Sequence, residues 1–176
     1  MKIRFSTIVV ALAICASVAF TVHADTNGSQ GFRVIVPSTI SITAPSTTAV
    51  ITHDRSDNNQ QFPAQNWVVR GNVPNGVNVT FSTGSAFVNR SDSTAKRNVL
   101  LGVSVSSTQG PASWSVGPAT DTTNYLANDE IAQVGATSNG SGSANFDVSV
   151  SFVTEDFDLF TAGNYEVTVF GTVAAN

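Results

Sequence analysis

Apolar and polar residues alternate most regularly in the last third of the chain. After Gly163, the odd-numbered residues from Tyr165 to Val173 are apolar or glycine, and the residues between them are mostly polar. Residues 144–153 repeat this alternation over the longest uninterrupted run of the sequence. A period of two is typical of a β-strand with one face on a core and the other toward water. Both segments therefore predict long β-strands.

Shorter segments extend the same pattern along the chain. Further strands are predicted at residues 32–36, 40–44, 47–52, 67–69, 77–81, 99–105, 114–116 and 131–136. Asn75-Gly76 between alternating runs predicts a β-hairpin, and residues 82–96 are expected to form mostly loop. No window favours a helix of three turns. The pattern indicates an all-β protein, either a sandwich or a barrel, and favours an antiparallel Greek-key (Ig-like) β-sandwich of about 8–10 strands.

The first 24 residues have the features of a secretory signal. Lys2 and Arg4 precede an apolar run at 8–20, and a small-residue cleavage site ends at Ala24. A bulky Ile14 before Cys15 argues against a lipoprotein signal. We therefore expect a signal peptide (1–24), a flexible tail (25–31) and a single domain (32–176). The expected location is secreted or cell-surface, with transit through the periplasm in a Gram-negative host.

Charge and cysteine content narrow the class of protein. Loss of Lys2 and Arg4 with the signal lowers the formal net charge from −4 to −6, and the remaining basic residues are scattered, which argues against nucleic-acid binding. The mature chain has no cysteine, so its core must stabilise the fold without disulfides. It also has no second apolar stretch long enough to form a transmembrane segment.

Candidate chemistry is sparse. His53, the single histidine of the mature chain, lies in a polar loop beside Asp54, and this neighbourhood lacks the spacing that supports a catalytic triad. The acidic groups at 155–158 and 129–130 lack the spacing of a defined calcium loop. The sequence thus predicts no enzyme, no catalytic residue, no cofactor and no metal site. Trp67 and Trp114 are interpreted as core anchors, with sugar stacking as the alternative.

The arch before the last strand carries its own signal. Gly163 followed by Tyr165 at a strand entry favours a tyrosine corner, in which the phenol bonds back to backbone across the arch. The alternative is a glycine turn before a strand that begins with tyrosine. Tyr165 is therefore the candidate corner residue.

The C-terminal residues also suggest a family. The Thr-Ala-Gly-Asn-Tyr step at 161–165, opening a terminal alternating strand, resembles the ending of alpha-type pilins of the chaperone–usher class over about 16 residues. The lack of cysteine and a flexible tail before residues 32–36 are similar to those pilins. Trp114-Ser115-Val116 more weakly resembles the Trp-x-Leu cell-wall domains, with Val in the place of Leu.

This resemblance implies a function. We expect a non-catalytic structural or adhesive protein, a pilin-like (fimbrial) or extracellular-matrix fibre subunit. Self-assembly would use strand exchange, with Phe32, Val34 and Val36 as candidate donor-strand residues that enter a neighbour's groove. The alternative is a secreted carbohydrate- or protein-binding β-sandwich module whose partner is a surface glycan or a cell-wall component.

Overall fold

The computed structural model describes residues 27–176, and the compact part of the chain runs from Val36 to Asn176. The predicted signal peptide lies outside the described residues. The elements are β1 (Ile40–Thr43), β2 (Gln60–Gln61), β3 (Gln65–Gly71), β4 (Val77–Thr83), β5 (Phe87–Asn89), β6 (Lys96–Arg97), β7 (Val99–Gln109), β8 (Trp114–Val116), β9 (Thr120–Thr122), the 3₁₀ turn η1 (Tyr125–Ala127), β10 (Gln133–Ser138), β11 (Gly142–Phe152), the 3₁₀ turn η2 (Phe157–Leu159), β12 (Tyr165–Glu166) and β13 (Val169–Ala175).

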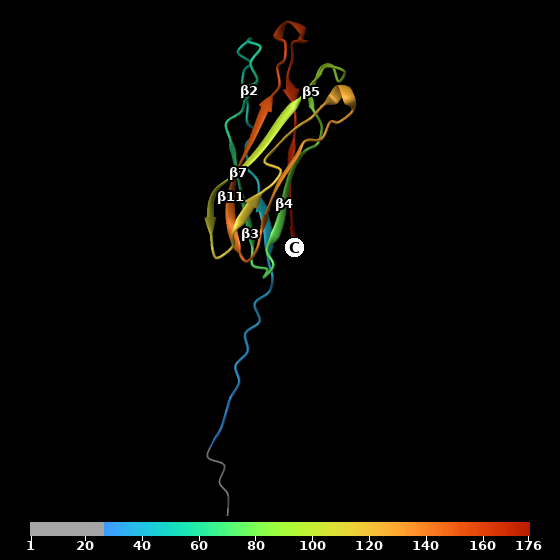
Figure 1. Ribbon diagram of the computed structural model, residues 1–176. Helices are drawn as coiled ribbons and strands as arrows, with labels where there is room; N and C mark the ends of the chain where they lie inside the picture. The colour runs from blue at the N-terminus through green and yellow to red at the C-terminus, as the bar shows by residue number, and fades with distance from the viewer. Residues whose placement is uncertain (1–26) are drawn as a thin grey trace, which may run out of the picture. The chain divides into compact units, whose positions relative to one another are not determined.

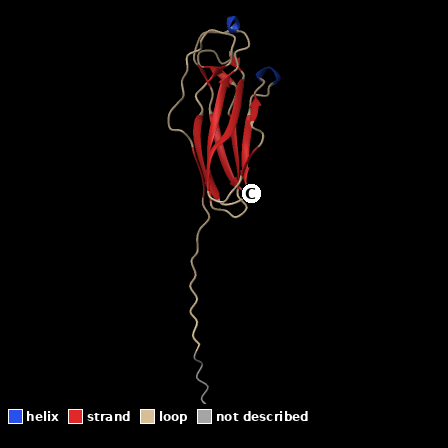
Figure 2. Ribbon diagram, turned by 60° about the vertical axis from the view of Figure 1, so that its left-hand side comes forward, coloured by secondary structure: helices blue, strands red, loops and turns tan. Residues whose placement is uncertain are grey.

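The strands form antiparallel sheets. One sheet has the order β1-β3-β11-β7-β9, with β2 also paired to β11, and a second has the order β13-β4-β10-β8. A small third sheet has the order β12-β5-β6. The long strands run alongside one another in two layers (Figure 1, Figure 2). The expected all-β class with antiparallel pairing is confirmed.

The core lies between the two larger sheets. Phe81 of β4 meets Trp67 of β3 edge-on, with ring centroids 5.4 Å apart, and its ring lies 5.7 Å from that of Phe146 on β11. Apolar side chains from both sheets complete this core: Val69, Val77, Val79, Leu101, Val103, Ala132, Val134, Ala136, Ala144 and Val148. The packing of two antiparallel sheets on one shared core is that of a β-sandwich.

A second apolar cluster lies toward the end of the sandwich that carries β2 and β5 (Figure 1). Phe87, Val99 and Phe152 are buried there, and Phe160 and Tyr165 pack against them. The third sheet and the arch before β12 supply part of this cluster, which therefore connects the small sheet to the sandwich.

The turn at Asn75-Gly76 exists, but the hairpin prediction was wrong. Gly76 has a φ of 80°, the left-handed conformation that favours glycine. However, β3 and β4 belong to different sheets, and β4 pairs with β10 and β13 instead. Both strands bury alternate side chains in the shared core, so the turn carries the chain across the core rather than along one sheet.

Other local predictions compare with the structure as follows. Residues 47–52 form no strand, and Val50 is exposed, because this stretch follows Pro45 as a loop. Residues 82–96 are mostly loop, as expected, although the short strands β5 and β6 pair there. The alternation of burial over 165–173 is confirmed, but the single predicted strand divides into β12, which pairs with β5, and β13, which pairs with β4.

Residues 32–36 also form no strand in the structure, although their alternation predicts one. Across residues 27–176, no helix has the length and apolar character needed to cross a membrane.

Candidate functional site

One edge of the second sheet ends in β13, which pairs on one side with β4. The Gly84 N–H donates to the Thr168 carbonyl (3.0 Å), and the Asn176 N–H donates to the Gly76 carbonyl (3.1 Å). In an antiparallel ladder, alternate residues direct their backbone groups to opposite sides of the strand. Odd-numbered residues of β13, such as Gly171, therefore direct their N–H and C=O groups away from β4. No other described strand pairs with that edge.

The edge strand of the first sheet, β1, has the same character. The Asn72 N–H donates to the Thr39 carbonyl (3.2 Å), so Thr39, Ser41 and Thr43 direct their backbone groups toward β3. Ile40 and Ile42 therefore direct their N–H and C=O groups to the outer side, where no strand of residues 27–176 pairs with them.

β1 and β13 lie next to each other and define what we call the open side of the sandwich. Ile40 and Ile42 from β1, with Val169 and Val173 from β13, point toward the core but are half-buried. At Gly171 a Cβ would lie 2.7 Å from Ile42 Cδ1 and 2.6 Å from a ring carbon of Trp67. The open side thus combines two edges of unpaired backbone with apolar side chains that the fold does not fully cover.

The candidate donor-strand residues lie in an exposed stretch of chain. Phe32 is 87% exposed, Val34 86% and Val36 76%, and Ile35 is similarly exposed. These side chains are apolar, and within the described chain none of them has a place in either hydrophobic cluster. Residues 32–36, which we call the N-terminal segment, therefore expose an alternating apolar sequence without sheet pairing.

In the structure, Tyr165 contacts the arch that precedes it in the chain. The Tyr165 hydroxyl donates to the Thr161 carbonyl (2.9 Å), and its ring packs edge-on against Phe152 at 5.4 Å. Asn89 of β5 holds the same arch, because its amide nitrogen approaches the carbonyls of Thr161 (3.5 Å) and Ala162 (3.4 Å).

Sequence reasoning missed Asn89, which is buried at 1% exposure. Its nearest sequence signal is Gly163, where φ is 155° and a Cβ would lie 2.5 Å from the Asn89 amide nitrogen. Glycine at position 163 lets the arch close on the Asn89 side chain. Asn89 lies 72 residues before Thr161 in the sequence, so no local pattern identifies it as a partner of the arch.

His53 takes part in an aromatic cluster. Its ring stacks on Phe157 with centroids 5.0 Å apart, and it meets Phe152 and Phe160 edge-on. Nδ1 accepts a hydrogen bond from the Arg55 N–H (3.0 Å), and Nε2 lies 3.1 Å from the Thr154 hydroxyl. Both ring nitrogens therefore have partners that hold the loop in place.

Asp54 serves the same loop. Its carboxylate accepts from the Ser56 hydroxyl (2.7 Å) and the Ser56 N–H (2.8 Å). These bonds, from the Ser56 hydroxyl first, lower the pKa of Asp54 below its usual value, because they stabilise the ionised form. Its closest approach to His53 Nδ1 is 3.9 Å, which is longer than a hydrogen bond.

The acidic groups at 155–158 and 129–130 have local partners. Asp156 accepts from the Asp158 N–H (3.0 Å) at the start of η2, and Glu130 forms an ion pair with Lys96. Among residues 27–176, no three His, Cys, Asp or Glu side chains gather closely enough to hold a metal ion.

Both tryptophans take part in core packing. Trp67 is 9% exposed, and Trp114 of β8 is half-buried, with its ring edge-on to Phe146 at 5.3 Å. Phe170 lies on the outer face of β13. Among the described residues, it is the one large exposed aromatic side chain that lies within a strand.

A scan against protein-family models and searches among curated proteins and solved structures gave no match to this chain.

Proposed function

We propose that this protein is a non-catalytic fibre subunit, a secreted or cell-surface β-sandwich that assembles by β-strand exchange. In this proposal the fold is an Ig-like Greek-key sandwich that lacks one edge strand. The N-terminal segment of one copy fills the open side of the next. The observation that carries the proposal is the combination of an open side and an exposed apolar segment in the same chain.

The open side has the properties of a strand acceptor. Ile42 and Val173 offer half-buried apolar surface, and the outward backbone groups of β13 offer hydrogen-bond partners for an added strand. Strand addition of this kind obtains its affinity from backbone hydrogen bonds and its specificity from alternate side chains in pockets. An uncovered edge is also a liability for aggregation, which gives a reason for it to be covered in the native state.

The N-terminal segment has the properties of a donor. In an extended conformation Phe32, Val34 and Val36 point to one side, and Arg33 and Ile35 point to the other. Burial of a Phe or Val side chain contributes about 1.5–3 kcal/mol, so three such side chains make the covered state strongly favourable.

The test compares mature protein (25–176) with a truncated chain (37–176). We expect mature protein to form polymers in size-exclusion chromatography and negative-stain images, and the truncated chain to remain a folded monomer. A synthetic peptide of residues 31–36 should bind the truncated chain. At a concentration one hundred times its Kd, the peptide should stabilise the truncated chain by about 2.7 kcal/mol.

A pair of substitutions provides the matched control. Val34→Asp places a carboxylate on the side that enters the acceptor, where burial of an unpaired charge is costly, so assembly should be lost. Ile35→Asp adds the same charge on the opposite side and should leave assembly largely intact. Equal loss in both variants would argue against strand exchange with this alternation.

A mature chain that stays monomeric at high concentration and after long incubation would overturn the proposal. If such a monomer bound members of a glycan array, the alternative of a carbohydrate-binding module would be favoured instead.

A further inference from the structure

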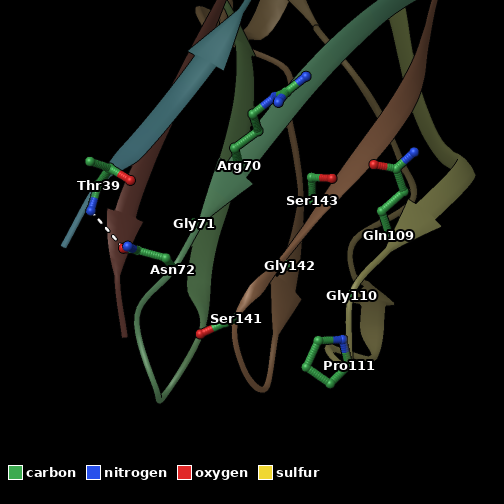
Figure 3. A pocket seen from close by; sticks show the side chains of 10 residues that line it. All are labelled: Thr39, Arg70, Gly71, Asn72, Gln109, Gly110, Pro111, Ser141, Gly142 and Ser143. Atoms are coloured by element: carbon green, nitrogen blue, oxygen red, sulfur yellow. Dashed lines mark hydrogen bonds between the residues drawn. The ribbon is translucent and has the colours of Figure 1, made fainter. Parts of the chain in front are cut away.

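Asn72, the residue after β3, binds the chain that leads into β1. Its side-chain Oδ1 accepts from the Thr39 N–H at 2.6 Å, and its Nδ2 donates to the Pro37 carbonyl at 2.9 Å. Its own N–H donates to the Thr39 carbonyl at 3.2 Å. Figure 3 shows the Asn72 side chain directed at Thr39 at the end of the first sheet. These three bonds form what we call the Asn72 clamp.

The clamp keeps Pro37–Thr39 in line with β1. The regular register begins at Ile40 opposite Gly71, and the bond between Asn72 and Thr39 continues it by one residue. Pro37 has a fixed φ, and the residue before a proline is biased toward extended conformations. The stretch 36–39 therefore has no glycine to form a tight turn, and the Pro37 carbonyl and both backbone groups of Thr39 are already bonded to Asn72.

To fill the open side of its own chain, the N-terminal segment would need a tight turn in the backbone. The N-terminal segment directly precedes β1, and the open side lies along the outer edge of β1. A segment that folds back onto that edge must reverse direction within Pro37–Thr39, as in a β-hairpin. The Asn72 clamp holds the same three residues in the opposite, extended arrangement.

Strand direction adds a second obstacle. A Cβ at Gly71 would lie 2.7 Å from Val77 Cγ1, so β3 ends where β4 begins and the two strands run in opposite directions. Because β1 is antiparallel to β3 and β13 is antiparallel to β4, β1 and β13 also run in opposite directions. A hairpin partner of β1 would thus be parallel to β13, the slightly less stable pairing. A segment from a second copy enters without a connection to β1 and can take either direction; if it runs antiparallel to β13, it runs parallel to β1.

We propose that the Asn72 clamp determines which molecule supplies the missing strand: it prevents the N-terminal segment from closing on its own open side and leaves that side to a second copy of this chain. This inference rests on the proposed function and adds to it a positioning residue. Short, stiff connections that cannot fold back are a general cause of exchange between identical chains.

The main test inserts a flexible linker of about six Gly and Ser residues between Val36 and Pro37 of the mature chain, which leaves the clamp intact but allows reversal before it. A short flexible linker gives an effective concentration in the millimolar range, so at ~1 μM protein closure within one chain should be favoured about a thousandfold over exchange. We expect the linker variant to be a monomer at micromolar concentrations, with the amides of residues 32–36 protected from hydrogen exchange.

The clamp itself is tested by Asn72→Ala in the chain without the linker. Loss of both side-chain bonds should raise the share of closed monomer about tenfold, as measured by sedimentation velocity over a dilution series. Asn66→Ala is the matched control, because Asn66 is an exposed asparagine of β3 whose side chain bonds to Asp147 and Ser106 instead. That variant should assemble as the unaltered protein does.

The outcomes separate this inference from the proposed function. If unaltered protein forms polymers and the linker variant forms them equally well, the clamp does not decide the partner, although strand exchange stands. An unaltered monomer with residues 32–36 protected would also overturn this inference, because its own segment would then fill its open side. An unaltered monomer with those amides unprotected would overturn the proposed function.

Discussion

The two long sides of the sandwich differ in how the sheets are joined. On the side of β8 and β9, residues 117–119 cross from one sheet to the other. The Gly117 N–H donates to the Gly135 carbonyl (2.9 Å), and the Gly135 N–H donates to the Pro118 carbonyl (3.1 Å). The Val103 N–H donates to the Ala119 carbonyl (2.9 Å), so this crossing segment bonds to both sheets.

The open side has no equivalent crossing segment within residues 27–176. The difference lies in these backbone bonds rather than in the burial of the edge strands, because Val116 of β8 is half-buried, as are Ile42 and Val173. Backbone groups at an unpaired edge must bond to water or to another chain, and the proposed function assigns a neighbour's strand to those of the open side.

The largest expected difference is between truncating a side chain in the core and truncating one on the open side. Leu101 on β7 is fully buried, so Leu101→Ala should lower the free energy of unfolding by about 2–5 kcal/mol. Ile42→Ala removes a half-buried side chain and should cost less, about 1–2 kcal/mol in the truncated chain 37–176. Denaturant titrations measure both values. Equal losses would mean that the open side is as well covered as the core near β9.

The Ile42→Ala variant also tests whether the 31–36 peptide covers the open side. If the peptide covers Ile42, the substitution should cost more in the complex than in the truncated chain alone, and the Kd of the peptide should rise. Leu101→Ala should leave that Kd unchanged, because Leu101 lies in the core and not on the open side.

Two glycines provide a smaller, matched comparison. At Gly135 a Cβ would lie 2.7 Å from the Val79 carbonyl oxygen, a backbone atom that the ladder holds in place. Gly135→Ala should therefore cost about 2–3 kcal/mol. At Gly171 the added Cβ meets the end of the half-buried Ile42 side chain and the buried Trp67 ring rather than backbone, so Gly171→Ala should cost less, about 1–2 kcal/mol. Thermal unfolding measures both variants. If Gly171→Ala lowered the stability more than Gly135→Ala, this expectation would be wrong.

The sequence predicted the parts of the fold that depend on local alternation. Residues 144–148 and 169–173 bury alternate side chains as the pattern indicates, because a strand on a single core requires that period. The candidate donor-strand residues were also identified from alternation alone, and their assignment stays a prediction.

What the sequence did not predict depends on contacts between distant residues. Asn75-Gly76 determines a tight turn, but the choice between a hairpin and a crossing depends on which strands β4 meets later in the chain. The short strands β5 and β6 have too few residues to show a period. Asn72 and Asn89 are single polar residues whose partners are set by the tertiary fold, so no spacing rule reveals them.

The smallest predicted effect concerns the arch that leads into the open side. Tyr165→Phe removes the hydrogen bond to the Thr161 carbonyl but keeps the ring against Phe152. Because water has access to this bond, the loss should be about 0.5 kcal/mol, the low end for a hydrogen bond. Tyr165→Ala is the control that removes the ring as well, and it should cost several times more.

Because the arch leads toward β13, Tyr165→Phe also tests whether the open side differs from the side of β8 and β9. β13 pairs with β4 on one side, and Tyr165 and Asn89 hold the chain just before it. Hydrogen exchange of the β13 amides should therefore rise in Tyr165→Phe, while amides of β10 beside the crossing segment should not change. Equal effects on β13 and β10 would show that the arch stabilises the sandwich as a whole, and the open side would then have no special dependence on it.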